Sequence, residues 1–266
     1  MRRWRPALYN PITNPEIMGV SDHVLPYFTA FRDPLSVLYQ KAFLPTFPND
    51  FVRDVYLGTL PSVSWLIPPL GFDEHPSASP QRGMYFTSLV LDALTANPEV
   101  WSKTAFFLMY DENDGWFDHV SPITAPPGTP GEWLTRQPNK LQSPDADTLG
   151  FNGPLGLGVR VPMLVMSPFS RGGHIATEVF DHTSQLKLVS ERFGVELPNV
   201  SAWRQSVVGD LTSALFQNTP SASVPTLPVP ALGSIELTGS CNEVSQDSEA
   251  GGTTPTIPLI QAMPVQ

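Results

Sequence analysis

The stretch TAFFLMYDENDGWFDH, residues 104–119, contains an apolar run followed directly by a dense polar cluster. The apolar run, Thr104–Met109, has the length and composition of a buried strand. The next ten residues hold four carboxylates, one amide and one imidazole. Open α/β sheets bind their ligands outside the carboxyl ends of their strands. The stretch therefore predicts an α/β protein with a polar site at the end of this strand.

The polar cluster is suited to metal-assisted chemistry. Asp111 and Glu112 are adjacent and offer hard oxygen ligands for a divalent cation, and His119 can donate a proton or pair with an anion. A polar turn that closes the strand is an open alternative, because Asn, Asp and Gly are ordinary turn formers. An EF-hand loop fits poorly, because its sixth position would be Trp116 rather than Gly.

A second polar cluster, Gly71–Pro76, follows a shorter apolar segment at Ser62–Ile67. The helical spacing of apolar residues over 83–96, ended by Asn97-Pro98, places a helix between the two apolar segments. Strand, helix, strand is the pattern of a parallel βαβ unit, which would bring both clusters to one edge of a sheet. Metal-held oxygens together with histidines suit phosphoryl chemistry. The alternative for Glu74-His75 is an exposed acidic loop.

The segments after the first cluster are less regular. Residues 121–158 form a long Pro/Gly-rich excursion, which in compact domains is usually a functional lid or disordered. The aromatic loop 116–133 could dip into a lipid surface, or it could pack its rings into the core. Residues 159–169 return as a strand that ends at Ser167-Pro168.

Three further helices are expected. Short ones are indicated near 22–31 and 49–58, and an amphipathic helix follows Phe180–Gln185. We expect Asp181 to cap the start of this last helix and Gly194 to end it. His182 remains a candidate site residue.

Composition changes at about Gln217, after which Pro, Ser, Thr and Gly dominate and Lys and Arg are absent. Such a segment lacks the apolar periodicity needed to offset chain entropy. We therefore expect one catalytic-type domain over 1–216 and a mostly disordered tail over 217–266, with at most a short strand near 234–237.

Overall composition excludes several classes of protein. The balance of 15 basic against 25 acidic residues argues against a nucleic-acid binder. The single cysteine, Cys241, excludes an internal disulfide framework, and no window reaches the roughly 18 consecutive apolar residues of a membrane span. The GxSxG elbow, the phosphate-binding P-loop and the HExxH zinc helix are all missing. Metal-assisted hydrolysis or no catalysis at all remains.

Several ordered motifs resemble those of the bacterial phospholipase C branch of the phosphoesterase family, in particular its mycobacterial members. The resemblance covers roughly residues 1–216 and implies the α/β sandwich of alkaline phosphatase-like enzymes. The motifs are EHP at 74–76, YDEN at 110–113, FDHV at 117–120, APPGTPGE at 125–132, GPLGLGVRVP at 153–162, SPFSRG at 167–172 and FDHTS at 180–184.

The resemblance also implies a reaction and a cofactor. The implied reaction is metal-assisted hydrolysis of phosphatidylcholine and related phospholipids to diacylglycerol and a phosphorylated head group, during transient contact with a membrane. Asp111 and Glu112 would be ligands of the divalent metal ion. His75 would contact the substrate phosphate, and His119 with Asp118 would lie nearby as leaving-group or supporting residues. The implied catalytic residues are Glu74, His75, Asp118 and His119.

The chain departs from the family pattern in its first part. It lacks the family's twin-arginine export signal, its Glu-Asn metal motif and its threonine nucleophile segment, and we interpret Thr13 as a coincidental match. We therefore expect the C-terminal half of a secreted or envelope-associated enzyme, retained in the cytoplasm without a signal and inactive or weakly active alone. A non-catalytic remnant that binds metal or lipid and a phosphomonoesterase are the alternatives.

Overall fold

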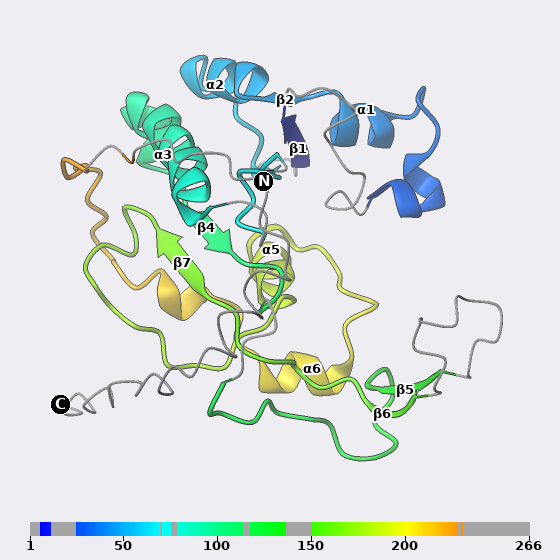
Figure 1. The fold of residues 1–266 in the computed structure, drawn as a ribbon. Helices are drawn as coiled ribbons and strands as arrows, with labels where there is room; N and C mark the ends of the chain where they lie inside the picture. Colours follow the sequence, from blue (N-terminus) through cyan, green and yellow to red (C-terminus); the bar gives the residue numbers. More distant parts are fainter. Residues whose placement is uncertain are drawn as a thin grey trace, which may run out of the picture.

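The computed structural model describes residues 6–11, 25–69, 71–75, 79–113, 118–136, 151–227 and 230. Within these ranges helices alternate with short strands, and the strands form three small sheets (Figure 1). The α/β class is therefore confirmed, whereas the alkaline phosphatase-like sandwich stays a prediction. None of the helices in the described ranges is long and apolar enough to cross a membrane.

The first sheet consists of three parallel strands in the order β2-β1-β3. In its register Ala7 of β1 lies opposite Ser64 of β3, and Asn10 lies opposite Thr46 of β2. The apolar segment predicted as a strand at 62–67 is thus confirmed. The three strands are β1 (Pro6–Pro11), β2 (Thr46–Phe47) and β3 (Val63–Leu66).

Two short helices connect these strands. α1 (Val37–Phe43) begins after Ser36, whose Oγ accepts the backbone N–H of Tyr39 at 3.0 Å. α2 (Asn49–Tyr56) confirms the helix predicted at 49–58. The helical segment predicted near 22–31 is confirmed in part, because two short 3-10 helices lie among its described residues. Pro26 lacks an N–H for a continuous α-helix, and the two 3-10 helices are η1 (Leu25–Tyr27) and η2 (Thr29–Phe31).

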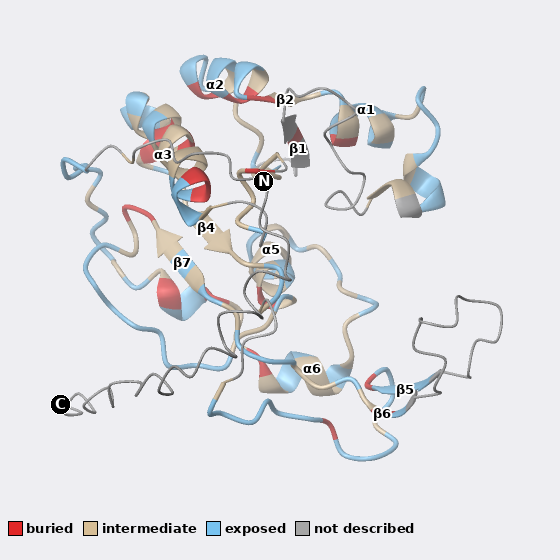
Figure 2. Ribbon diagram, viewed as in Figure 1, coloured by how far each residue is buried: buried red, intermediate tan, exposed pale blue. Residues whose placement is uncertain are grey.

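The apolar core lies where the first sheet meets α2 and α3 (Pro80–Ala96). The rings of Tyr9 and Phe51 pack edge to face with centroids 5.2 Å apart. The Tyr9 hydroxyl donates to Oδ2 of Asp54 at 2.8 Å, and burial raises the pKa of Tyr9. Figure 2 shows buried positions gathered on the inner sides of α2 and α3. The buried cluster comprises Tyr9, Phe47, Phe51, Val55, Val90, Leu94 and Trp101.

The end of α3 confirms the predicted stop at Asn97-Pro98. Asn97 Oδ1 accepts the backbone N–H of Glu99 at 3.1 Å and so caps α4 (Pro98–Trp101). Its Nδ2 donates to the carbonyl of Val55 at 2.8 Å. One side chain therefore ends one helix, starts the next and ties both to α2.

The strand predicted at 104–110 is confirmed as β4 (Phe106–Met109), but its partner differs from the prediction. β4 pairs antiparallel with β7 (Met163–Met166), so that Phe106 lies opposite Met166. β3 pairs instead with β1. The parallel βαβ unit predicted from 62–110 is therefore wrong within the described residues, because apolar runs specify strands but not their partners.

The Pro/Gly-rich excursion at 121–158 contains a second antiparallel pair of strands. β5 (Trp133–Arg136) runs against β6 (Phe151–Pro154), with Trp133 opposite Pro154. The alternative that 121–158 is disordered is wrong for these strands, the functional lid stays a prediction, and 137–150 lie outside the described residues. Nε1 of Trp133 donates to Oδ1 of Asn152 at 2.7 Å, and its side chain is partly exposed rather than packed in the core.

The last helices are α5 (Ser184–Phe193), α6 (Ala202–Val207) and the 3-10 turn η3 (Thr212–Ala214). Gly194 ends α5 at φ 70°, which confirms its predicted role because a left-handed residue closes a helix best as glycine. The N-cap of α5 is Thr183 rather than Asp181. Asp181 lies two residues earlier, and its Oδ1 accepts the backbone N–H of Thr183 at 2.8 Å.

The predicted tail falls mostly outside the described residues. Residues 217–227 carry neither helix nor strand, and Gln217 donates its backbone N–H to the carbonyl of Phe169 at 2.9 Å. The strand expected near 234–237 and the disorder expected beyond 230 lie outside the described part and remain predictions, as does the domain boundary at 216.

Candidate functional site

A hydrogen bond joins the two predicted polar clusters. The hydroxyl of Tyr110, one residue after β4, donates to Oε2 of Glu74 at 2.5 Å. Burial, followed by the hydrogen bond and the negative charge of Glu74, raises the pKa of Tyr110 to about 12. The Tyr110 hydroxyl therefore stays protonated at neutral pH and acts as a hydrogen-bond donor to Glu74. The bond fastens the loop that carries His75 to the strand end that carries Asp111.

Glu74 is held in an unusual position against α3. Its φ of 63° lies in the left-handed region, which costs a non-glycine residue about 1–3 kcal/mol and persists only where the surroundings enforce it. Gly83 of α3 leaves the space, because a Cβ there would lie 2.1 Å from Oε1 of Glu74. Nearby, Nε of Arg82 donates to the carbonyl of Gly71 at 2.6 Å. The loop 71–75 is thus clamped to the first turn of α3.

Asp111 and Glu112, the predicted metal ligands, follow Tyr110 directly and are both exposed. The strand end that carries them is anchored by the backbone N–H of Tyr110, which donates to the carbonyl of Pro162 at 3.3 Å. His75 is also exposed, and its backbone N–H donates to Oδ1 of Asp73 at 3.3 Å.

The acidic pair does not by itself make a complete cation site. Over the ranges that the structure describes, no group of three or more His, Cys, Asp or Glu side chains is close enough to hold a metal ion. Hard divalent cations need six or more oxygen ligands, some of which water can supply. The metal site predicted for Asp111 and Glu112 therefore stays a prediction, and the described residues supply only part of it.

Asp118 and His119 form an oriented acid–base pair. The Asp118 side chain is only 5% exposed, and its Oδ1 lies 3.0 Å from Nδ1 of His119 while also accepting the His119 backbone N–H at 2.7 Å. The His119 side chain is 90% exposed. The carboxylate lies beside Nδ1, and the other ring nitrogen of this exposed side chain can give or take a proton. The pair is thus suited to general acid–base chemistry at the surface.

Arg160 completes this group and was missed by sequence reasoning. Its Nε donates to Oδ2 of Asp118 at 2.5 Å. This hydrogen bond, helped by the backbone N–H groups of Val120 and His119, holds the pKa of Asp118 below its usual range. Arg160 is 42 positions from Asp118 along the chain, so no local spacing rule could have linked them. The guanidinium binds one oxygen of the carboxylate whose other oxygen lies beside the imidazole, and an Arg side chain of this kind can bind a phosphate.

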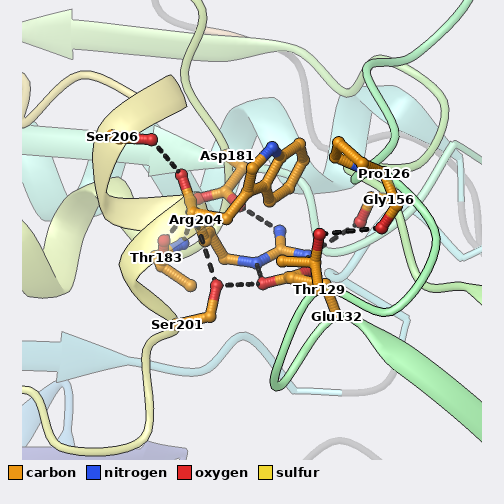
Figure 3. A network of polar contacts seen from close by, with 10 residues as sticks. Pro126, Thr129, Glu132, Gly156, Asp181, Thr183, Ser201, Arg204 and Ser206 are labelled. Atoms are coloured by element: carbon orange, nitrogen blue, oxygen red, sulfur yellow. Dashed lines mark hydrogen bonds and ion pairs between the residues drawn. The ribbon is translucent and has the colours of Figure 1, made fainter.

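A second polar network is centred on Arg204 and joins it to Glu132 and Asp181 (Figure 3). Arg204 of α6 donates twice to Glu132, from Nη2 to Oε2 at 2.6 Å and from Nε to Oε1 at 2.9 Å. Its Nη1 bonds Oδ2 of Asp181 at 2.5 Å, and its Nη2 also donates to the carbonyl of Gly156 at 2.9 Å. Ser201 Oγ donates to Oε1 of Glu132 at 2.6 Å.

The network joins segments that are far apart in the sequence. Glu132 is only 2% exposed and Arg204 15%. The hydrogen bond from Arg204 lowers the pKa of Glu132, and the two carboxylates raise that of Arg204. For Asp181, burial raises the pKa, but the hydrogen bonds from Thr183 and Arg204 outweigh it and the net shift is downward. His182 beside it is exposed.

Comparison with known proteins agrees with the motifs. The model of a family described as the Phosphoesterase family matches residues 13–196, well over half of the chain. The chain belongs to the phosphoesterase family. The chain is 46% identical to phospholipase C A of Mycobacterium tuberculosis over 245 aligned residues, and these cover 89% of the chain and 46% of the relative. It is 43% identical over 249 residues to phospholipase C B of the same organism, covering 90% of the chain and 46% of the relative.

A relative outside the mycobacteria is similar as well. Non-hemolytic phospholipase C of Pseudomonas aeruginosa is 50% identical over 182 residues, which cover 66% of the chain and 26% of that protein. The resemblance to bacterial phospholipases C is therefore confirmed. The chain spans about half the length of the mycobacterial relatives it matches.

Proposed function

We propose that this phosphoesterase carries part of a phospholipase C active site, which hydrolyses phosphatidylcholine-type phospholipids to diacylglycerol and a phosphorylated head group. The observation that carries the proposal is the exposed imidazole of His119 held by the buried carboxylate of Asp118 beside Arg160. The names of the relatives, all phospholipases C, support the substrate class.

The proposed roles follow from position and charge. His119 protonates the leaving alkoxide of diacylglycerol, and Asp118 keeps its other ring nitrogen protonated. Arg160 places positive charge where negative charge develops on the phosphate. Glu74 and Tyr110 hold the loop of His75, so we give Glu74 a positioning role and His75 the contact with the phosphate.

We propose that Asp111 and Glu112 supply two ligands of a divalent cation whose other ligands lie outside the described residues. Such a cation would neutralise charge on the phosphodiester. We also propose that the 266-residue protein alone turns over slowly or not at all, because two exposed carboxylates hold a cation weakly and none of the described residues stands out as an activated nucleophile. Transient contact with a lipid surface belongs to the same proposal.

A chimera tests the substrate class directly. The matching region of M. tuberculosis phospholipase C A is replaced by this chain, and release of phosphorylated choline from phosphatidylcholine vesicles is measured beside hydrolysis of a simple phosphate monoester. We expect diester hydrolysis that His119→Ala lowers by about 10²–10⁴-fold. A folded chimera that cleaves only the monoester would show that the site is a phosphatase.

The 266-residue protein is then tested by itself. Calorimetric titration with Zn²⁺, Mn²⁺ or Ca²⁺ is expected to show weak binding that is lost in Asp111→Asn. The matched control is Asp92→Asn, which removes an exposed carboxylate of α3. Robust turnover of phosphatidylcholine by this protein, abolished by Asp111→Asn and not by Asp92→Asn, would refute the proposed inactivity.

A further inference from the structure

The segment after η3 is fastened to the loop that leaves β7. Gln217 donates its backbone N–H to the carbonyl of Phe169 at 2.9 Å and its Nε2 to the carbonyl of Arg171 at 2.8 Å. Figure 1 shows this segment, drawn in orange, running beside the loop that follows β7. Residues 168–175 and 216–224 therefore form one continuous face, which we name the strap surface.

Arg171 lies at the centre of the strap surface, and two serine hydroxyls flank its guanidinium. Its Nη1 donates to the hydroxyl of Ser221 at 2.7 Å and to that of Ser223. The two hydroxyl oxygens lie 3.2 Å apart, and because one donates to the other, the second hydroxyl can donate to a ligand. Arg171 is exposed and, among the described residues, forms no ion pair with a carboxylate. A guanidinium beside hydroxyl donors is suited to binding the oxygens of a phosphate.

The strap surface lacks the negative charge that the rest of the chain carries. Residues 168–177 and 211–227 contain Arg171 and His174 but neither Asp nor Glu, whereas the whole chain has a net charge of −10. Other arginines of the described chain, such as Arg160, are paired with carboxylates. The guanidinium of Arg171 is therefore complementary to an anionic oxygen that a ligand supplies.

Exposed apolar side chains lie on the same face as these donors. Ile175 is 83% exposed, and Phe216 and Val224 are 42% and 46% exposed. The ring of Phe216 packs edge to face on His174 with centroids 4.5 Å apart, which holds Phe216 beside the loop that carries Ile175. A lipid surface requires this combination, because apolar side chains enter the acyl boundary while the donors reach the head groups.

The charge of the chain selects the kind of lipid. An anionic bilayer attracts basic segments and repels acidic ones, and a single guanidinium does not offset a net charge of −10. A phosphatidylcholine bilayer has no net charge but still presents a phosphate in every head group. The strap surface therefore fits a zwitterionic bilayer better than an anionic one.

We propose that the strap surface docks on a phosphatidylcholine bilayer, with Arg171 bound to a lipid phosphate and Ile175 and Phe216 inserted at the interface. This docking rests on the lipid contact proposed above and names the residues that make it. Arg160 precedes β7 and the strap surface follows β7, so the docked face anchors the protein and leaves the cleaved phosphate to the site of His119.

Sedimentation with sucrose-loaded vesicles tests the docking on the full 266-residue chain. A metal chelator is present throughout, so that hydrolysis does not consume the lipid. We expect the chain to sediment with phosphatidylcholine vesicles and more weakly with phosphatidylglycerol vesicles. Inorganic phosphate should not release it, because free phosphate lacks the apolar contact. Amide hydrogen exchange of 171–175 and 216–224 should slow when phosphatidylcholine vesicles are added, and this reading needs no variant.

Substitutions of Arg171 test the phosphate contact. Arg171→Gln should weaken vesicle binding by about fivefold, and Arg171→Lys, which keeps the positive charge, should weaken it less. The matched control is Arg192→Gln, which removes the same charge from an exposed arginine in the last turn of α5 and should leave binding unchanged. Hydrogen exchange of 216–224 in each free variant reports whether this segment stays on the loop after β7.

Substitutions of isoleucine test the apolar contact. Ile175→Ser leaves the hydrogen bonds of Arg171 in place, so it keeps the test valid even where Arg171→Gln releases the segment 216–224. It should weaken vesicle binding by at least about fivefold. Ile123→Ser is the matched control, because Ile123 is also exposed but lies in the loop 116–133, the other candidate for lipid contact.

Several results would overturn the docking. They are no sedimentation with phosphatidylcholine vesicles, tighter binding to phosphatidylglycerol, release by inorganic phosphate, equal weakening by Arg171→Gln and Arg192→Gln, or greater weakening by Ile123→Ser than by Ile175→Ser. The last result would assign the lipid contact to the loop 116–133. Vesicle binding is read without hydrolysis, so binding by the chain beside an inactive chimera refutes only the proposed function. An active chimera beside a chain that binds no vesicles refutes only the docking.

Discussion

Replacing Arg204 by methionine should destabilise the protein strongly while preserving most of the apolar volume of the side chain. The change removes the paired hydrogen bonds to Glu132 at 2.6 and 2.9 Å, the ion pair to Asp181 at 2.5 Å and the bond to the Gly156 carbonyl. Glu132, 2% exposed, keeps only the Ser201 hydroxyl as a side-chain partner.

The magnitude follows from these contacts. Removing one partner of a buried ion pair costs about 3–5 kcal/mol, because it leaves an uncompensated charge in a low-dielectric site. Asp181 suffers less than Glu132, since it retains two bonds from Thr183. With a urea dependence of about 2 kcal/mol per molar, Arg204→Met should lower the urea midpoint by about 2 M. Tryptophan fluorescence and circular dichroism report the transition.

Arg53→Met is the matched control. Arg53 also pairs with two carboxylates, Asp50 at 2.7 Å and Asp54 at 3.2 Å, but its side chain is 59% exposed. Water already screens both pairs, so the midpoint should hardly move. If Arg204→Met and Arg53→Met unfold at the same urea concentration, burial does not set the strength of the Arg204 network and the reasoning is refuted.

Three further outcomes are expected. Gly83→Ala places a Cβ 2.1 Å from Oε1 of Glu74 and should lower the free energy of unfolding in urea by about 1–3 kcal/mol. The control Gly173→Ala meets no atom within 4 Å and should lower it far less. Equal losses would exclude the packing of Glu74 against Gly83. Ultraviolet titration should show a tyrosinate transition at about pH 12 that is missing in Tyr110→Phe, and an unchanged titration would disprove the Glu74 bond. The hydrogen bond from Arg204 lowers the pKa of Glu132 from its ordinary value of 4.5 in the folded protein. The Glu132 carboxylate therefore stabilises the fold fully above its pKa in the unfolded chain, and this stability is lost as pH falls through the lower pKa of the folded state. Below about pH 4.5 the melting temperature should fall less steeply in Glu132→Gln than in the unmodified protein, and parallel curves would contradict this.

Local patterns in the sequence were enough to locate several elements. β4 and α3 follow from an apolar run and from helical spacing closed by Asn97-Pro98, and both signals depend only on neighbouring residues. Gly194 was recognisable because only glycine takes the left-handed position without cost. These elements are the ones whose existence is decided by the chain within a few residues.

Pairing between strands was not predictable in the same way. β4 pairs with β7, more than 50 positions away, and nothing in the run Phe106–Met109 selects that partner. β5 and β6 were hidden because the segments WLTR and FNGP carry glycine, proline and few β-branched residues. Their pairing arises from tertiary contacts such as the bond from the Leu155 N–H to the Glu132 carbonyl at 2.9 Å.

In the candidate site too, contacts between neighbouring residues were predicted and contacts between distant residues were missed. His119 was predicted from the polar cluster that follows the strand and Asp118 from the family resemblance, and the structure places the two in contact. Arg160 and Arg204, which set the charge around the acidic residues, were missed because they lie 42 and 72 positions from Asp118 and Glu132. The left-handed backbone of Glu74 was also invisible, since the sequence places no glycine there. The catalytic and metal roles of the six predicted residues remain predictions.

The pairing of β5 with β6 allows the chain between them to be cut without separating the two sides. Residues 118–136 are held to the following segment by the hydrogen bonds between β5 and β6. They are held to α6 by the two hydrogen bonds that Arg204 donates to Glu132. A protease that cuts the backbone once between 137 and 150 would therefore leave two pieces joined by noncovalent contacts. The nicked protein would migrate as two bands in denaturing gels and as one particle in native buffer.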